Sequence, residues 1–286
     1  MSASLSGEVL QLRGDQAAND VFIAQSDSGV ISIQGRNGTT INGQAAVRFN
    51  GNGLEKTDIR LFGGNDRLTL NDLRVTTDHN IEMGLGDDVV VLNRTRSGLV
   101  TSVKTDDGVD RVTAVGVRTG SDLNILTGQG AGVVNVRATI AGGSLTVLGL
   151  DSRDIVNVVG TGVRKDININ TGKGNDAVAL VDVNSTLSTT ITTDLGNDRI
   201  RTLRVDTGED LNVQSGEGSD AVNLTDTRSR KNIGVNVDTG NDTVLVDNVF
   251  AAFDAVFIGG DGFDTFDNNG VRAGEKLEIK EFERRI

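Results

Sequence analysis

The chain has 286 residues, of which 24% are charged, and its formal net charge is -12 at pH 7. This acidic balance argues against nucleic acid and anionic membrane surfaces as partners, because both require basic patches, and it favours cations. Cysteine, tryptophan, tyrosine and proline are absent, so we expect neither disulfide bonds nor large aromatic anchors to stabilise the fold. No apolar run approaches the roughly 20 residues of a transmembrane helix.

Residues 1–57 alternate apolar and polar side chains but keep no fixed spacing. The stretches Val9–Leu12 and Val30–Ile33 have the period of two that is typical of half-buried strands. An Asn19-Asp20 pair resembles a turn that recurs later in the chain. We expect an N-terminal cap of irregular β coils, since an open stack of repeats needs a cap at each end. The opening residues lack the charged and apolar regions of a signal peptide.

Residues 58–271 repeat with a constant period of 22. One position, here named the phase position, holds aspartate in every repeat except the one with Gly132. We call its nine aspartates the aspartate column: Asp66, Asp88, Asp110, Asp154, Asp176, Asp198, Asp220, Asp242 and Asp264. Self-similarity at such a period indicates a solenoid, in which each repeat forms one coil stacked on its neighbours.

Two apolar columns run through these repeats, at seven residues before and two after the phase position, and a third column, seven after it, is softer because it includes threonines. Around Asp198 they are Ile191, Ile200 and Val205, and their β-branched side chains favour strands. Glycine stands two residues before the phase position in every repeat except at Ser152, which indicates a turn with an unusual backbone angle. The pattern predicts an all-β, right-handed parallel β-helix of about ten regular coils, with the hand taken from the crossover rule.

A second period of 44 residues is superimposed on the first. Four residues before the phase position, glycines alternate with Asp106, Asp194 and Asp238. A 44-residue unit of four strands would also suit a β-propeller of about five blades, but the regular half-period and the lack of aromatic packing disfavour that alternative.

Residues 272–286 become charged and amphipathic, which is consistent with a closing strand or a short helix. We expect this segment to be the C-terminal cap that shields the last coil.

The aspartate column requires compensation for its charge, because two carboxylates about 5 Å apart repel by roughly 3 kcal/mol at an effective dielectric constant of 20. Each aspartate can accept backbone N–H groups of its own glycine turn, which is a purely structural role. Alternatively, a cation can lie between adjacent turns, and oxygen ligands without histidine or cysteine select calcium. Both alternatives remain open.

The segment Gly259–Asp267, GGDGFDTFD, resembles the calcium-binding nonapeptide G-G-x-G-x-D-x-U-x of RTX proteins. Segments 84–90, 172–178 and 216–222 match it without the first glycine. The resemblance implies a secreted or cell-surface bacterial protein in which Ca²⁺ lies between stacked turns, bound by motif aspartates and loop carbonyls. This chain departs from the family because it carries the motif once per coil of 22 residues. Besides the aspartate column, the expected calcium ligands are Asp106, Asp194, Asp238 and Asp261.

Other residue clusters indicate little chemistry. His79 is the only histidine, and we interpret it as a partly buried stacking residue and not as a base. Arg74, Arg96 and Arg118 form a basic stripe, which we interpret as edge protection, with contact to an acidic polysaccharide as the alternative. A threonine column five residues before the phase position would suit ice binding only on an outer face, and we expect it to point inward.

We therefore expect a non-enzymatic, monomeric calcium-binding solenoid that acts as a structural or adhesive module. Its expected partners are calcium and an extracellular polysaccharide or protein. The alternative is a β-helical polysaccharide lyase or hydrolase, or a polysaccharide-binding protein. Such enzymes usually have long loops and aromatic platforms, which this regular sequence lacks.

Overall fold

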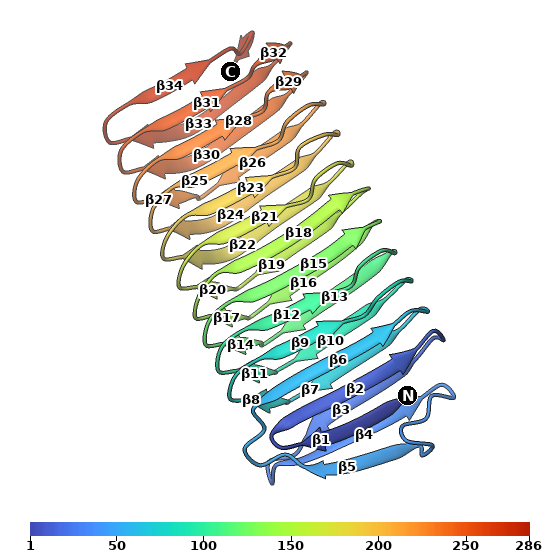
Figure 1. Ribbon diagram of the computed structural model, residues 1–286. Helices are drawn as coiled ribbons and strands as arrows, with labels where there is room; N and C mark the ends of the chain where they lie inside the picture. Colours follow the sequence, from blue (N-terminus) through green and yellow to red (C-terminus); the bar gives the residue numbers. More distant parts are fainter. The chain divides into compact units, whose positions relative to one another are not determined.

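A computed structural model describes residues 1–286 and consists of β-strands without any helix (Figure 1). The chain forms a parallel β-solenoid of about ten turns with a 22-residue spacing, which confirms the predicted fold class. Its contacts divide it into two compact units, which we call unit 1 (Met1–Gly143) and unit 2 (Ser144–Ile286). The structure has no helix that is long and apolar enough to span a membrane.

In unit 1, most coils contribute one strand to each of two sheets, named sheet A and sheet B, and a short third strand. Sheet A contains β1 (Ser2–Ser6), β2 (Val9–Asp15), β6 (Lys56–Phe62), β9 (His79–Glu82), β12 (Thr101–Lys104) and β15 (Leu123–Gln129). Sheet B contains β5 (Ala46–Asn50), β4 (Val30–Arg36), β3 (Asp20–Gln25), β7 (Arg67–Asn71), β10 (Val89–Asn93), β13 (Asp110–Val115) and β16 (Gly132–Arg137). The third strands are β8 (Arg74–Val75), β11 (Arg96–Ser97), β14 (Arg118–Thr119) and β17 (Ile140–Ala141).

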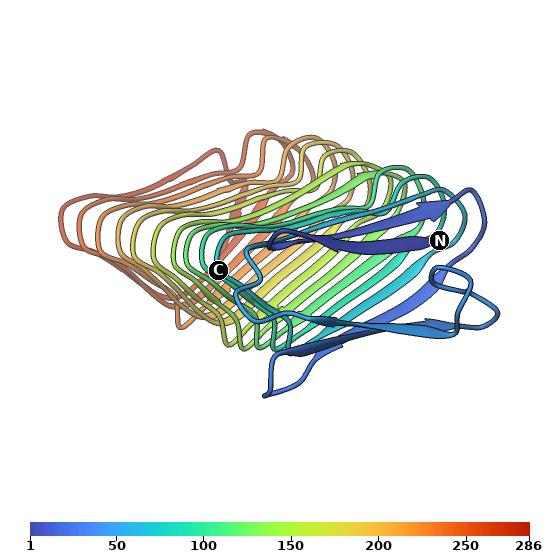
Figure 2. The same cartoon turned by 60° about the horizontal axis from the view of Figure 1, so that its bottom comes forward.

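The N-terminal segment combines one coil with antiparallel strands. Strand β2 pairs in parallel with β6, and β3 pairs in parallel with β7, so residues 9–25 form a coil below the regular repeats. Strand β1 folds back on β2, and β4 and β5 extend from β3, all in antiparallel pairs. In Figure 2 these strands lie beside the coil nearest the viewer. The chain between β3 and β6 is therefore an insertion that interrupts the 22-residue spacing.

Unit 2 has the same organisation, and the corresponding sheets keep their names. Sheet A contains β18 (Leu145–Asp151), β21 (Ile167–Asn170), β23 (Thr189–Thr192), β25 (Leu211–Gln214), β28 (Ile233–Asn236), β31 (Ala255–Ile258) and β34 (Leu277–Lys280). Sheet B contains β19 (Ile155–Val159), β22 (Ala177–Ser185), β24 (Arg199–Thr207), β26 (Ala221–Thr225), β30 (Thr243–Ala251), β33 (Thr265–Ala273) and β35 (Arg284–Arg285). Shorter strands are β20 (Gly162–Val163), β27 (Arg228–Ser229), β29 (Thr239–Gly240) and β32 (Asp261–Gly262).

Within each unit the register between coils is one full repeat. Val103 pairs with Ile81 in unit 1, and Val213 pairs with Ile191 in unit 2. The apolar columns consequently stack inside the coil, and Ile191, Ile200 and Val205 are at most 1% exposed. Burying one such side chain contributes about 1.5 to 3 kcal/mol, so repetition of the columns supplies the core.

The C-terminal end of unit 2 is closed by aromatic packing. The ring of Phe266 lies 4.9 Å from that of Phe257 and 5.2 Å from that of Phe282. Strand β34 stacks on β31, so the expected closing element is a strand and not a helix.

A backbone feature that the sequence analysis missed lies six residues after the phase position. In every regular coil this residue has a positive φ, for example 55° at Asp182 and 52° at Arg204. Their side chains form a bidentate ion pair, with Nε to Oδ1 at 2.5 Å and Nη2 to Oδ2 at 2.9 Å. This ion pair joins two adjacent coils at a corner that bends the chain out of sheet B.

Candidate functional site: the aspartate column

A glycine turn between sheet A and sheet B places each column aspartate. At Gly196 φ is +145°, and an added Cβ would lie 1.5 Å from the carbonyl oxygen of Gly174 in the neighbouring coil. Only glycine fits so close an approach of two backbones. Ser152 holds the same position with φ of +83°, so a side chain is forced into the left-handed region there.

The column aspartates point into the coil and are 0 to 3% exposed. In eight of these residues, all except Asp154, one carboxylate oxygen, Oδ1, accepts a main-chain N–H group of the preceding coil in the same unit. The backbone N–H of Asp66 donates to Oδ1 of Asp88 at 2.7 Å, and that of Asp176 donates to Oδ1 of Asp198 at 2.7 Å. The remaining pairs are 88–110 in unit 1 and 154–176, 198–220, 220–242 and 242–264 in unit 2, all at 2.7 or 2.8 Å.

The sequence also allowed each carboxylate to accept N–H groups of its own turn, and this interpretation is wrong about which coil supplies the donor. The donor belongs to the preceding coil because the side chain extends along the stacking direction and not back over its own turn. Each bond therefore ties two coils together.

Three residues mark where the ladder starts, ends or is interrupted. Asn19 donates its backbone N–H to Oδ1 of Asp66 at 2.7 Å, so the turn predicted from Asn19-Asp20 occupies a phase position. The N–H of Asp264 donates to Oε2 of Glu283 in the C-terminal cap at 2.6 Å. Because Gly132 has no carboxylate, the N–H of Asp110 donates instead to the carbonyl of Ala131 at 3.0 Å.

The second oxygen, Oδ2, is buried and has no hydrogen-bond partner in most of the column. This holds for Asp66, Asp88, Asp110, Asp176, Asp198, Asp220, Asp242 and Asp264. A buried acceptor without a donor costs about 1 to 3 kcal/mol, and more when it is charged. The column is thus stabilising through Oδ1 and destabilising through Oδ2.

Burial raises the pKa of these carboxyls above their usual range. The pKa rises to about 7 at Asp88 and Asp242, mainly through desolvation and then through the neighbouring aspartates, which outweigh the backbone hydrogen bond. At Asp198 desolvation raises the pKa to about 6, and the backbone N–H of Asp176 and then the Thr193 hydroxyl partly offset it. Near neutral pH, the carboxyls of Asp88 and Asp242 can therefore hold a proton.

The threonine column is the environment of Oδ2. Thr105, Thr171 and Thr193 are 0% exposed, which confirms that the column points inward. The Thr171 hydroxyl lowers the raised pKa of Asp176, although the two groups lie outside hydrogen-bonding geometry. At Asp88 and Asp242 the corresponding positions hold Met83 and Val237 and offer no hydroxyl, and these two carboxyls have a pKa of about 7.

A second ladder, which the sequence analysis missed, runs on the outer side of the same turn. The backbone N–H of Asn197 donates to Oδ1 of Asn175 at 2.7 Å, and that of Ser219 donates to Oδ1 of Asn197 at 2.6 Å. Here the acceptor lies in the earlier coil, whereas in the aspartate column it lies in the later one. Asparagine recurring one residue before the phase position was the available signal.

The four remaining calcium candidates lie outside the column. Asp106 is half-buried and forms an ion pair with Lys104 at 2.6 Å. Asp194, Asp238 and Asp261 are exposed. Asp194 and Asp238 lie in the coils on either side of Gly216, where they line a hollow of about 150 Å³ together with Thr192, Gln214 and Asn236.

The column residues do not fit calcium as direct ligands. Calcium takes six to eight oxygens, but Oδ1 already accepts an N–H group and Oδ2 faces hydroxyl or apolar side chains. No group of three or more histidine, cysteine, aspartate or glutamate residues gathers where an ion could be held. The exposed oxygens around Gly216 have the right donor chemistry, with two carboxylates.

His79 is fully buried, more than predicted. Its Nδ1 lies 2.9 Å from the Thr57 hydroxyl, and burial lowers its pKa to about 4. A neutral, enclosed imidazole of this kind packs between coils.

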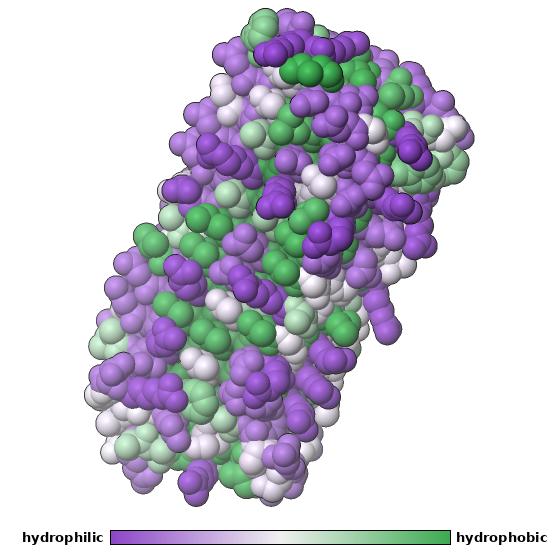
Figure 3. All heavy atoms as spheres, turned by 180° about the vertical axis from the view of Figure 1, so that it is seen from behind, coloured by the Kyte–Doolittle hydropathy of each residue, from purple (hydrophilic) through white to green (hydrophobic).

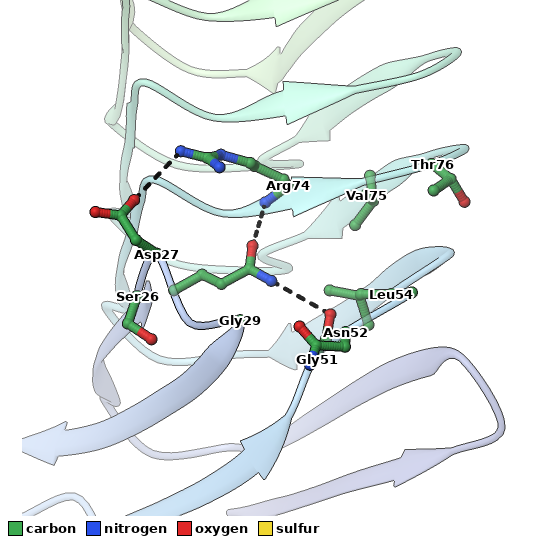
Figure 4. A pocket seen from close by; sticks show the side chains of 11 residues that line it. Ser26, Asp27, Gly29, Gly51, Asn52, Leu54, Arg74, Val75 and Thr76 are labelled. Carbon is green, nitrogen blue, oxygen red and sulfur yellow. Dashed lines mark hydrogen bonds and ion pairs between the residues drawn. The ribbon is translucent and has the colours of Figure 1, made fainter.

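The arginine stripe is exposed and stacked in register on β8, β11 and β14. At its lower end Arg74 lies 3.8 Å from Asp27, and its N–H donates to the Gln25 side chain at 2.9 Å. These contacts border a hollow of about 270 Å³ (Figure 4). Arg74 therefore joins the N-terminal insertion to the third strands.

Hydrophobic side chains also reach the surface, as separate areas among hydrophilic ones on the face seen in Figure 3. Leu195 and Phe263, both in glycine turns, are 39% and 59% exposed.

Comparisons with protein-family models, with curated proteins and with solved structures find no match to this chain.

Proposed function

We propose that this protein is a non-enzymatic structural β-solenoid, which serves as a stiff spacer or adhesive module outside the cell or on its surface. The observation that carries the proposal is the pair of side-chain ladders around the glycine turn. They run in opposite directions and join coil to coil, so the most regular and most buried polar groups of the chain serve cohesion.

The extracellular location follows from the resemblance of Gly259–Asp267 to RTX repeats and is part of the proposal. The resemblance does not extend to calcium in the aspartate column, because the column residues do not fit the ion. In this proposal the negative charge of the aspartate column is compensated by bound protons and by backbone N–H groups, and not by metal ions.

A second candidate function is calcium binding at the exposed oxygens around Gly216. Asp194 and Asp238 face a common hollow that also has hydroxyl and amide oxygens, which are hard ligands. With two carboxylates the affinity would be low, and binding there would not hold the fold together.

Thermal unfolding separates these roles. We expect the same melting temperature in EDTA and in millimolar calcium at matched ionic strength. Saturating binding at 100 times Kd would add about 2.7 kcal/mol, which corresponds to roughly 5 to 10 °C in a chain of this size. A calcium-specific rise of that size, absent with magnesium, would contradict the metal-free column.

The non-enzymatic part is tested by incubating the chain with alginate, polygalacturonate and neutral glucans. We expect no new unsaturated or reducing ends. Turnover that persists through purification to constant specific activity would overturn it in favour of the polysaccharide lyase or hydrolase alternative.

A further inference from the structure

On the outer face of sheet A in unit 2, six consecutive strands carry no charge, and charge appears only on the last strand, β34, at Glu278 and Lys280. The second and fourth residues of β18, β21, β23, β25, β28 and β31 point outward and are exposed or half-buried, and we call these twelve residues the neutral face. They are Asn, Gln, Thr and Gly residues with a few aliphatic ones. At the chain's average of 24% charged residues, about three of the twelve would be charged.

The fold does not impose this neutrality. The same two columns in unit 1 hold Asp58, Arg60 and Glu82, whose side chains form ion pairs with Nε–O distances of 3.2 and 3.3 Å. In unit 2, the outer face of sheet B carries Arg199 and Arg201. Charged side chains are thus compatible with the coil, and their absence is a property of this one surface.

The polar groups of the neutral face are available to a partner. The side chains of Asn168, Asn212 and Gln214 are exposed, whereas Oδ1 of Asn170 and of Asn236 each accept a backbone N–H group two residues on. Asn168, Thr190 and Asn212 lie in register on adjacent strands, about 4.8 Å apart. Each side-chain amide and each hydroxyl can both donate and accept hydrogen bonds. The face is therefore a regular grid that matches partner groups, such as hydroxyls, that also donate and accept.

Gly234 interrupts the grid with a hollow of about 230 Å³ beside Asn212 and Val256. An added Cβ at Gly234 would meet only Oδ1 of Asn212, at 3.4 Å. The hollow therefore exists because the side chain is missing, and it gives a bulky substituent a place on an otherwise flat surface.

Carboxylates frame the face on both sides. Asp166, Asp210 and Asp254 immediately precede β21, β25 and β31, and Asp194 and Asp238 follow β23 and β28. These rims disfavour an anionic polymer, and they disfavour a second copy of this acidic chain packed face to face, because like charges would meet. A cationic partner would bind the aspartates at the edges and not the amide and hydroxyl side chains of the neutral face.

We infer that the neutral face binds an uncharged, polyhydroxylated polymer, that is, a neutral polysaccharide chain lying across the strands. The inference deepens the proposed adhesive role and rests on it. Without aromatic platforms each sugar contributes little, so binding depends on many repeated contacts along one long chain.

The test is affinity electrophoresis of the full chain in native gels that contain dextran, xyloglucan or hydroxyethyl cellulose, with alginate as the anionic probe. We compare the wild type with Asn212→Asp plus Gln214→Glu, which places two charges on the face. The matched control is Asn80→Asp plus Ser102→Glu, which adds the same charge to unit 1 at two positions that correspond to Asn212. Circular dichroism verifies that both variants are folded.

We expect retardation by at least one neutral polymer and none by alginate. The Asn212/Gln214 variant should bind about tenfold more weakly, since a buried unpaired charge costs at least about 1.4 kcal/mol, and the control variant should bind like the wild type. The inference is overturned if no neutral polymer retards the chain, or if both variants are affected equally. It is also overturned if sedimentation shows that the face mediates self-association. The thermal unfolding experiments with calcium and EDTA involve no polysaccharide. A negative result in the gels therefore overturns the polysaccharide inference and does not affect the proposed structural function.

Discussion

The two oxygens of a column aspartate have opposite effects on stability. Oδ1 of Asp198 accepts the N–H of Asp176, whereas Oδ2 is buried without a partner and raises the pKa of the carboxyl to about 6. A side chain with the same shape and no charge would keep the favourable half of this arrangement. Substitution of Asp198 by asparagine therefore separates the effect of the hydrogen bond from the effect of the buried charge.

We expect Asp198→Asn to be at least as stable as the wild type at pH 8, because the amide oxygen still accepts the N–H and no charge is buried. Asp198→Ala should lose about 1 to 3 kcal/mol, because the Asp176 N–H is left unpaired. Urea unfolding at pH 8 measures both. Exposed Asp194→Asn, in the same turn, is the control and should change stability by less than about 0.5 kcal/mol. A large loss in Asp198→Asn would indicate a role for the negative charge, such as metal binding.

Ser152 is the one residue with a side chain at the glycine position of the turn, and its φ is +83°. Left-handed conformations cost residues other than glycine roughly 1 kcal/mol. We expect Ser152→Gly to raise the free energy of unfolding by several tenths to about 1 kcal/mol, measured by urea unfolding. Gly196→Ser is the reverse change and should destabilise strongly, because its Cβ would meet the Gly174 carbonyl. Equal effects of the two changes would show that the turn is not under strain.

At the scale of the element, the glycine turn joins the coils by two ladders with opposite donor directions. The acceptors of the inner ladder are carboxylates, and every column member with a resolved shift has a raised pKa. The outer ladder does not titrate at Asn175 and Asn197, whose acceptors are amides. The pH dependence of stability thus reports on the inner ladder.

We expect the free energy of unfolding to fall as the pH rises from about 4 to about 7. In this window the folded state keeps protons on Asp88 and Asp242, with pKa values of about 7, while the unfolded chain has released them. A state that binds more protons is weakened when protons become scarce. Urea unfolding at pH 4.5, 6 and 8 measures the slope. Asp88→Asn with Asp242→Asn should flatten it, and stability that instead increases over this range would contradict buried, protonated carboxyls.

At the scale of the whole molecule, the net charge of -12 is distributed over exposed carboxylates as well as the column. Exposed charges are screened by salt, with a Debye length near 30 Å at 0.01 M and 10 Å at 0.1 M, whereas buried ones are screened far less. General repulsion and specific cation binding therefore predict different responses to ions.

We expect sodium chloride to raise the melting temperature modestly between 0.01 M and 0.1 M, because screening weakens the repulsion among surface carboxylates. Calcium and magnesium chloride should have the same effect at equal ionic strength. Differential scanning calorimetry at pH 7.5 makes the comparison. An effect of calcium far beyond that of magnesium would place an ion in the structure.

The coil could be predicted from the residue pattern. A constant 22-residue period with apolar columns such as those of Ile191 and Ile200 leaves stacking in register as the way to bury all of them at once, and the recurring glycines fixed the turn. Tertiary structure alone decided the partner of each aspartate, since a period gives the position of a side chain but not its direction along the stack. It also decided the left-handed corner at Asp182, because many residue types occupy this position in the repeats. The antiparallel insertion after β3 could not be predicted either, because it contains no sequence repeat.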